Sequence, residues 1–129
     1  MLHIKHPSDA QEISHLGIHQ LIQQRLSELH LPPEETLSEV GHFIITQTGD
    51  KAADLEKASG CHITTDPDGS NHYGTSDYAP CFEWLEHHKE KGCFELVFIM
   101  TDDGFFTVLF IPDEPDIDPL LLSFCREYS

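Results

Sequence analysis

The sequence predicts an α+β domain with a mixed, mainly antiparallel sheet of about four strands, packed by three to four helices. Two apolar runs around a turn signal, at residues 94–111, predict a central β-hairpin. Other segments have apolar residues at helical spacing and are separated by short strand-like runs. The length of 129 residues fits one domain, spanning residues 1–129.

The hairpin segment reads FELVFIMTDDGFFTVLFI, and Asp103-Gly104 is typical of a two-residue type I′ turn. That turn would place Leu96 opposite Ile111. Because side chains alternate between the two faces of a sheet, both faces of this hairpin would be apolar. Both must then be covered, by helices of the same chain or by a second subunit.

In the first half of the chain, the pattern predicts a helix over Ser8–His30, with Ser8 or Asp9 as its cap and Glu12 completing a capping box. Pro32-Pro33 would end it. There follow a helical turn near 34–38, a strand at 40–48 and a helix over Lys51–Ser59 that Asp50 would cap.

In the second half, residues 61–65 resemble a brief strand and residues 66–77 a polar loop. A helix is expected from Ser76 or Asp77 to about Lys91, with Gly92 after its end. Asp118-Pro119 marks the start of a last helix that runs to about Tyr128.

The charge distribution restricts the partners. The formal net charge is −16, and twenty of the 23 acidic residues lie in residues 33–129. Clustered cations are needed to bind nucleic acid or an anionic membrane, so neither is expected as a partner. A basic protein or a cationic small ligand remains compatible. The chain has no long apolar run and no signal-peptide pattern, so we expect a cytoplasmic protein.

The four cysteines form no CxxC pair, and free thiols are expected rather than disulfides. Cys93 and Cys125 have apolar neighbours and are predicted to be core residues. Phosphate-binding, dinucleotide-binding and GxSxG motifs are missing, so the sequence names no reaction and requires no cofactor.

Two groups contain metal-ligand side chains. His15 and His19 are four residues apart in the first predicted helix, a spacing that can hold one metal ion, although two ordinary polar helix positions explain them as well. His3 and His6 could lie near that pair. The second group matches no defined zinc module and departs from the calcium-loop pattern, so a solvated loop is the alternative; it comprises Cys61, His62, Asp66 and Asp68.

A ligand pocket could form between the polar loop and the helix predicted after it. Aromatic walls with a few polar groups are typical of such pockets, although simple core packing also explains Trp84. The candidate lining residues are His72, Tyr73, Tyr78 and Trp84. A further alternative is a small cysteine-histidine enzyme, with Cys81 as nucleophile and His72 as base.

The string ELVFIMTDDGFFTVLFIP resembles a segment of small bacterial proteins without an assigned activity, of the kind borne on plasmids, integrons or other mobile elements. The resemblance covers about 18 of the 129 residues. It implies a bacterial cytoplasmic accessory protein and transfers no activity.

Together these features favour a non-enzymatic binding or interaction module that acts as a homodimer, with a protein or a small ligand as its partner. One alternative is an acidic inhibitor or antitoxin-like protein that covers a basic protein surface. The other is a small-molecule-binding or metal-binding protein, or a small Cys/His enzyme, that uses the 61–81 region.

Overall fold

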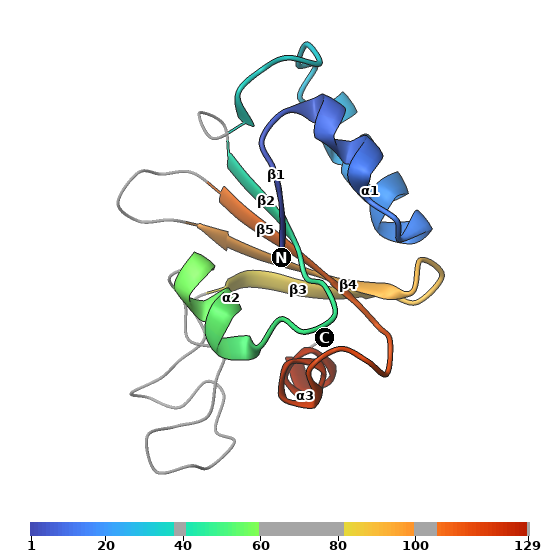
Figure 1. Cartoon of the computed structure of the whole chain (residues 1–129), viewed down its shortest axis with the longest axis vertical. Coiled ribbons are helices and arrows are strands. Elements are labelled where there is room, and N and C mark those ends of the chain that lie inside the picture. Colours follow the sequence, from blue (N-terminus) through green and yellow to red (C-terminus); the bar gives the residue numbers. More distant parts are fainter. Residues whose placement is uncertain (38–40, 60–81, 100–105, 129) are drawn as a thin grey trace.

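The computed structural model describes residues 1–37, 41–59, 82–99 and 106–128, and these form an α+β domain as predicted (Figure 1). Its strands are β1 (Leu2–Ile4), β2 (Gly41–Ile45), β3 (Phe82–His88), β4 (Cys93–Ile99) and β5 (Phe106–Pro112). Its helices are η1, a 3-10 helix (Pro7–Glu12), and the α-helices α1 (Leu16–Glu28), α2 (Ala52–Ser59) and α3 (Pro119–Tyr128). Within these residues, no helix combines the length and apolar content needed to cross a membrane.

The sheet has the order β1-β2-β5-β4-β3, in which β2 and β5 run parallel and the other neighbours run antiparallel. The predicted central hairpin is therefore β4 and β5, in the middle of the sheet. Its register differs from the prediction by two residues, because Leu96 pairs with Leu109 rather than Ile111. An even shift leaves every side chain on its predicted face.

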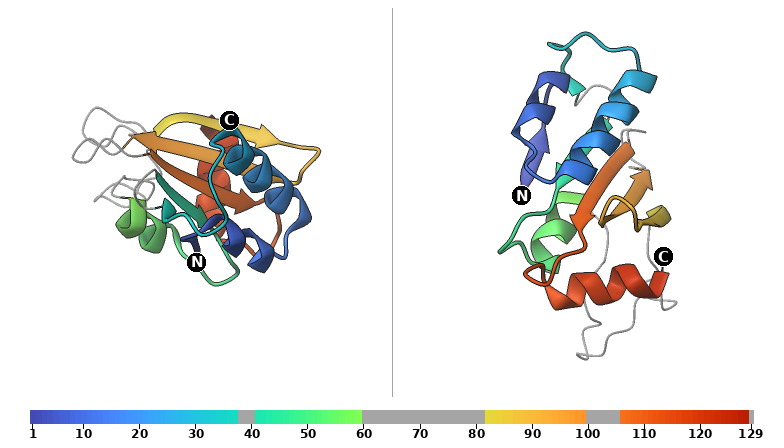
Figure 2. Two further views of the ribbon diagram at one scale, coloured as in Figure 1. Left: turned by 90° about the horizontal axis from the view of Figure 1, so that it is seen from above. Right: turned by 90° about the vertical axis from the view of Figure 1, so that its right-hand side faces the viewer.

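Helices of the same chain cover both faces of the sheet (Figure 2). Phe94, Leu96, Leu109 and Ile111 pack with α2 and α3 on one face. Val97, Val108 and Phe110 pack with η1 and α1 on the other face. The expectation of two apolar, covered faces is confirmed, and Cys93 and Cys125 are buried core residues, one on each side.

The continuous helix predicted over Ser8–His30 is wrong, because the segment breaks between η1 and α1. The Asp9 carboxylate bonds back to the backbone N–H groups of Lys5 and His6 rather than starting the helix. His15 begins α1, since its Nδ1 accepts from the Ile18 N–H at 3.1 Å. A histidine in this role, together with the 3-10 turn, is invisible to hydrophobic periodicity.

The helix predicted from Ser76 or Asp77 to Lys91 is also wrong over the described residues, where β3 and a tight turn take its place. β3 pairs with β4 along its length, from Phe82↔Phe98 to His88↔Cys93. Gly92, expected to follow a helix, has φ +68° in the turn between these strands. Pairing with the edge of the hairpin overrides the helix propensity of the Leu, Glu and Lys residues there.

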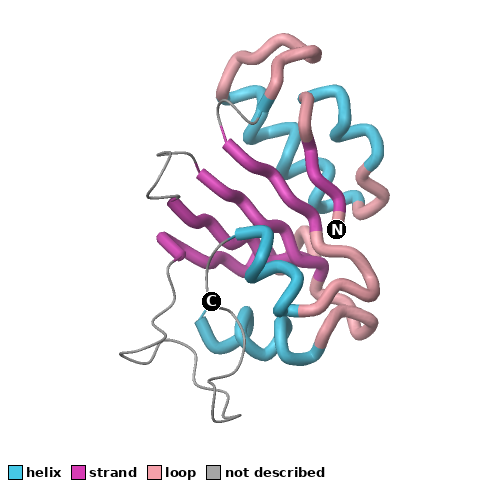
Figure 3. Tube along the Cα trace, turned by 60° about the vertical axis from the view of Figure 1, so that its left-hand side comes forward, coloured by secondary structure: helices cyan, strands magenta, loops and turns pink. Residues whose placement is uncertain are grey.

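The helices α2 and α3 agree with the prediction, and the Asp118 carboxylate accepts hydrogen bonds at the N-termini of both. Asp118 Oδ1 accepts from the Leu120 N–H at 3.1 Å, as the Asp-Pro pattern predicts. Its Oδ2 accepts from the Ala52 N–H at 3.0 Å, so Asp118 serves α2 as well. Asp50, the predicted cap of α2, instead pairs with the Met1 amino group at 3.0 Å. The tube view shows these two helices together beneath the sheet (Figure 3).

Candidate functional site

A pocket of about 430 Å³ lies where the parallel strands β2 and β5 end. The carboxyl ends of parallel strands are a common place for ligands in α/β sheets, because the connections leave toward opposite faces there. This sheet differs from that arrangement, because α2 after β2 and α3 after β5 pack on the same face. The lining residues are Leu2, Glu12, Ile13, Ser14, His15, Ile45, Thr46, Gln47, Thr48, Pro112, Glu114 and Ile117.

Thr46 is the unusual member of this wall. It is only 1% exposed, and its hydroxyl has no hydrogen-bond partner among the described residues. Its backbone N–H donates to the Phe110 carbonyl at 2.9 Å, which continues the β2–β5 pairing to the pocket edge. An unsatisfied buried hydroxyl costs about 1–3 kcal/mol, so such groups are rare and each calls for an explanation.

His15 also lines the pocket, and both of its ring nitrogens are engaged. Because Nδ1 accepts from the Ile18 N–H, Nε2 carries the ring proton and donates to the Gly92 carbonyl at 3.2 Å. The Glu114 carboxylate lies 3.6 Å from the same Nε2. His15 therefore ties α1 to the β3–β4 turn and orients Glu114, and its ring is already committed to these contacts.

The pocket is polar at its rim and apolar at its base. The exposed carboxylates of Glu12 and Glu114 supply negative charge, and neither Lys nor Arg is among the lining residues. Ile13, Ile45 and Ile117 are buried and supply the apolar part. This combination suits a ligand with a cationic head and a short apolar body.

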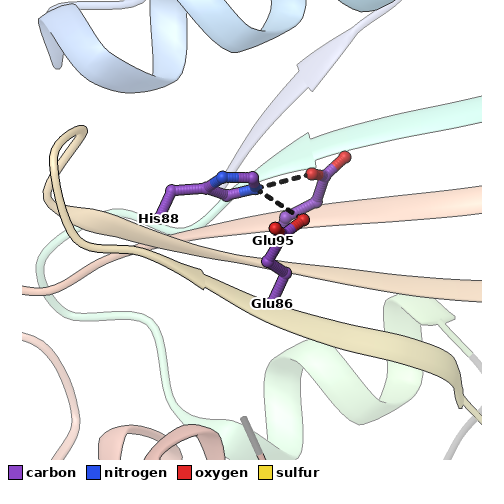
Figure 4. A group of neighbouring side chains, drawn as sticks. All are labelled: Glu86, His88 and Glu95. Carbon is purple, nitrogen blue, oxygen red and sulfur yellow. Dashed lines mark hydrogen bonds and ion pairs between the residues drawn. The ribbon is translucent and has the colours of Figure 1, made fainter.

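A second group of polar side chains lies on the α1 face of the sheet, at the β3 edge (Figure 4). Glu86 and Glu95 are direct partners in the β3–β4 register. His88 points between them, with Nε2 2.8 Å from Glu95 Oε1 and 3.6 Å from Glu86 Oε2. One nitrogen and two carboxylate oxygens in this arrangement are ligand types for a divalent metal ion.

Arg25 of α1 supplies a positive charge at this second group. Its Nε and Nη2 donate to the two oxygens of Glu95 at 3.0 and 2.7 Å. Burial alone would raise the pKa of Glu95, but the hydrogen bonds from Arg25 and His88 outweigh burial and hold that pKa below its usual range. A metal ion would have to compete with a fixed guanidinium, so we interpret the group as a structural charge network.

The residues singled out from the sequence are not brought together by the described structure. His15 begins α1 instead of sharing a helix face with His19, whose Nδ1 donates to the Ala10 carbonyl at 2.8 Å. Trp84 lies in β3 opposite Val97. The rest lie outside the described residues, so both the ligand pocket and the loop metal site stay predictions; these residues are Cys61, His62, Asp66, Asp68, His72, Tyr73, Tyr78 and Cys81.

Sequence reasoning missed Thr46, Glu114, Arg25 and Glu95. Glu95 carried a usable signal, because a lone acid within an apolar strand implies a buried partner. Thr46 and Glu114 carried none, since only the β2–β5 pairing makes them neighbours.

Comparison with known proteins gives no match, either to a family model, to a curated protein or to a solved structure. The function must therefore be argued from the geometry of this chain.

Proposed function

We propose that this protein binds a small organic cation in the pocket at the carboxyl ends of β2 and β5. The observation that carries the proposal is the hydroxyl of the lining residue Thr46, which is buried behind the pocket wall and has no hydrogen-bond partner in the described part of the chain. A ligand that shifts this wall slightly and offers a hydrogen bond would remove the cost of the unsatisfied group, which favours the bound state.

Charge supports a cationic head group. Glu114 and Glu12 line the rim, and the formal net charge of −16 attracts cations toward the whole surface. The apolar side chains of Ile13, Ile45 and Ile117 can accept a short hydrocarbon body. Binding rather than catalysis is favoured, because both nitrogens of His15 are used in holding α1 and the β3–β4 turn.

The first experiment compares hexylamine, hexanol and hexanoate by isothermal titration calorimetry at pH 7. These probes share the apolar body and differ in the charge of the head group. The amine is expected to bind tightest and hexanoate weakest, because of Glu114 and Glu12. Equal binding of all three, or none of the amine, would overturn the proposal.

Variants locate the site. Glu114→Gln should weaken hexylamine binding about tenfold, which corresponds to about 1.4 kcal/mol. Glu90→Gln, an exposed acid in the β3–β4 turn, removes the same charge elsewhere and should leave binding unchanged. Thr46→Val should weaken binding while the protein stays as stable as before or becomes more stable, since the lost hydroxyl has no partner among the residues that the structure describes. A less stable Thr46→Val that binds normally would contradict this role.

A further inference from the structure

We infer that a second pocket, at the opposite end of β2, binds a small oxyanion through an exceptional concentration of basic side chains. This inference is independent of the proposed cation site. The pocket has a volume of about 470 Å³ and lies where β1 leads into η1 and β2 begins. It is lined by His3, Ile4, Lys5, His6, Thr36, Gly41, His42 and Phe43.

The composition of this lining is unusual for the chain. Three of the ten histidines and one of the seven lysines and arginines line this pocket, and none of the acidic residues in the described part of the chain does. Thr36 adds a hydroxyl that can donate to an oxyanion. Basic side chains with a neutral donor in a concave site are what carboxylate and phosphate groups require.

Two carboxylates, Asp9 after His6 and Asp50 beyond the opposite end of β2, are held by other donors. Asp9 Oδ2 accepts from the backbone N–H groups of Lys5 and His6, both at 3.0 Å. Asp50 pairs with the Met1 amino group at 3.0 Å and accepts from the Gln47 N–H at 2.8 Å. These contacts direct both carboxylates toward the backbone and the terminal amine.

The electrostatic field agrees with this geometry. Burial lowers the pKa of His3, and the positive charges of the Met1 amino group, Lys5 and His42 lower it further, whereas Asp50 opposes them. His6 is oriented by its Nδ1, which donates to the Glu35 carbonyl at 3.0 Å. A bound anion would stabilise the protonated imidazoles, so binding should raise the pKa of His3 and strengthen as the pH falls.

Inorganic phosphate and acetate serve as probes, because they separate a phosphate-bearing from a carboxylate-bearing ligand. Histidine ring signals are followed by NMR during titrations at pH 6 and pH 8. Binding is expected to shift the signals of His3, His6 and His42, and to be roughly tenfold weaker at pH 8, where His3 is neutral because its pKa is lowered. The anion that binds tighter identifies the ligand class.

Lys5→Gln and His42→Gln should each weaken binding about fivefold or more at pH 6. Lys89→Gln, in the β3–β4 turn, makes the same charge change far along the chain and serves as the matched control. Thermal unfolding of each variant checks that the fold is kept. The inference is overturned if neither anion shifts these histidines, or if Lys89→Gln weakens binding as much as Lys5→Gln.

Discussion

At the scale of single residues, Glu95 is a carboxylate buried to 99% in the middle of β4, and Arg25 is the side chain that compensates it. Glu86 stands directly opposite on β3, a like-charge pair that is unfavourable by itself. The two-pronged contact from Arg25 and the hydrogen bond from His88 offset both the burial and the repulsion.

Arg25→Met should therefore destabilise the protein by about 3 kcal/mol at pH 7, because it leaves a buried charge with one partner fewer. Urea unfolding measures this loss. Arg126→Met removes the exposed Arg126–Asp113 pair and should cost at most about 1 kcal/mol, which makes it the control.

The pH dependence of this loss has a definite sign. In the native protein, the lowered pKa of Glu95 confers stability that is present above its unfolded value near 4.3 and is lost as the pH falls through the lower folded value. Without Arg25, burial raises that pKa, and the charged form becomes costly as the pH rises. The difference between the two proteins should thus shrink from pH 7 to pH 4; a constant difference would show that Arg25 acts through packing alone.

At the scale of elements, α1 meets the β3–β4 turn so closely that only glycine fits. A Cβ on Gly17 would lie 2.0 Å from the Lys91 carbonyl oxygen and 2.8 Å from its carbonyl carbon. Those are backbone atoms, which cannot move aside as a flexible side chain could. The His15–Gly92 hydrogen bond holds the same two elements together.

Gly17→Ala should consequently destabilise the protein by about 3 kcal/mol, the upper range for overpacking. Helix propensity alone predicts the opposite sign, a gain of about 1 kcal/mol for alanine. Thermal or urea unfolding decides between them, with Gln23→Ala on the exposed side of α1 as a control that should change little. A more stable Gly17→Ala would mean that α1 and this turn are farther apart.

At the scale of the whole molecule, one sheet separates two cores, and helices of this chain cover both. The doubly apolar hairpin therefore does not require a second subunit to cover it, and the homodimer stays a prediction. Because both cores share β4 and β5, we expect them to unfold as one cooperative unit.

The buried thiols test that cooperativity, since Cys93 belongs to the α1 core and Cys125 to the α3 core. Burial raises the pKa of Cys93 to about 12 and also raises that of Cys125, so neither should react in the folded state. In a Cys61→Ser/Cys81→Ser background, labelling by a thiol reagent should reveal the same opening free energy at both positions. Much faster labelling of one would show that its core opens separately.

The sequence by itself determined the α+β class, the apolar hairpin with two covered faces, the helices α2 and α3, and the buried positions of Cys93 and Cys125. These follow from local patterns, namely alternation, capping and apolar spacing, which act over a few residues. The terminal strand β1 is too short for such a pattern, and β3 has side chains that suit a helix as well as a strand.

Only the tertiary structure decided the strand pairing and hence the sites. Thr46 and Glu114 are 68 positions apart, and they share a pocket because β2 and β5 run parallel. Arg25 and Glu95 meet because α1 packs on the face of the sheet to which the Glu95 side chain points. Likewise His3, Lys5 and His42 converge because β1 pairs with β2. The physical reason is the same in each case: contacts between distant segments depend on which strands pair, and that choice depends on packing of the whole chain.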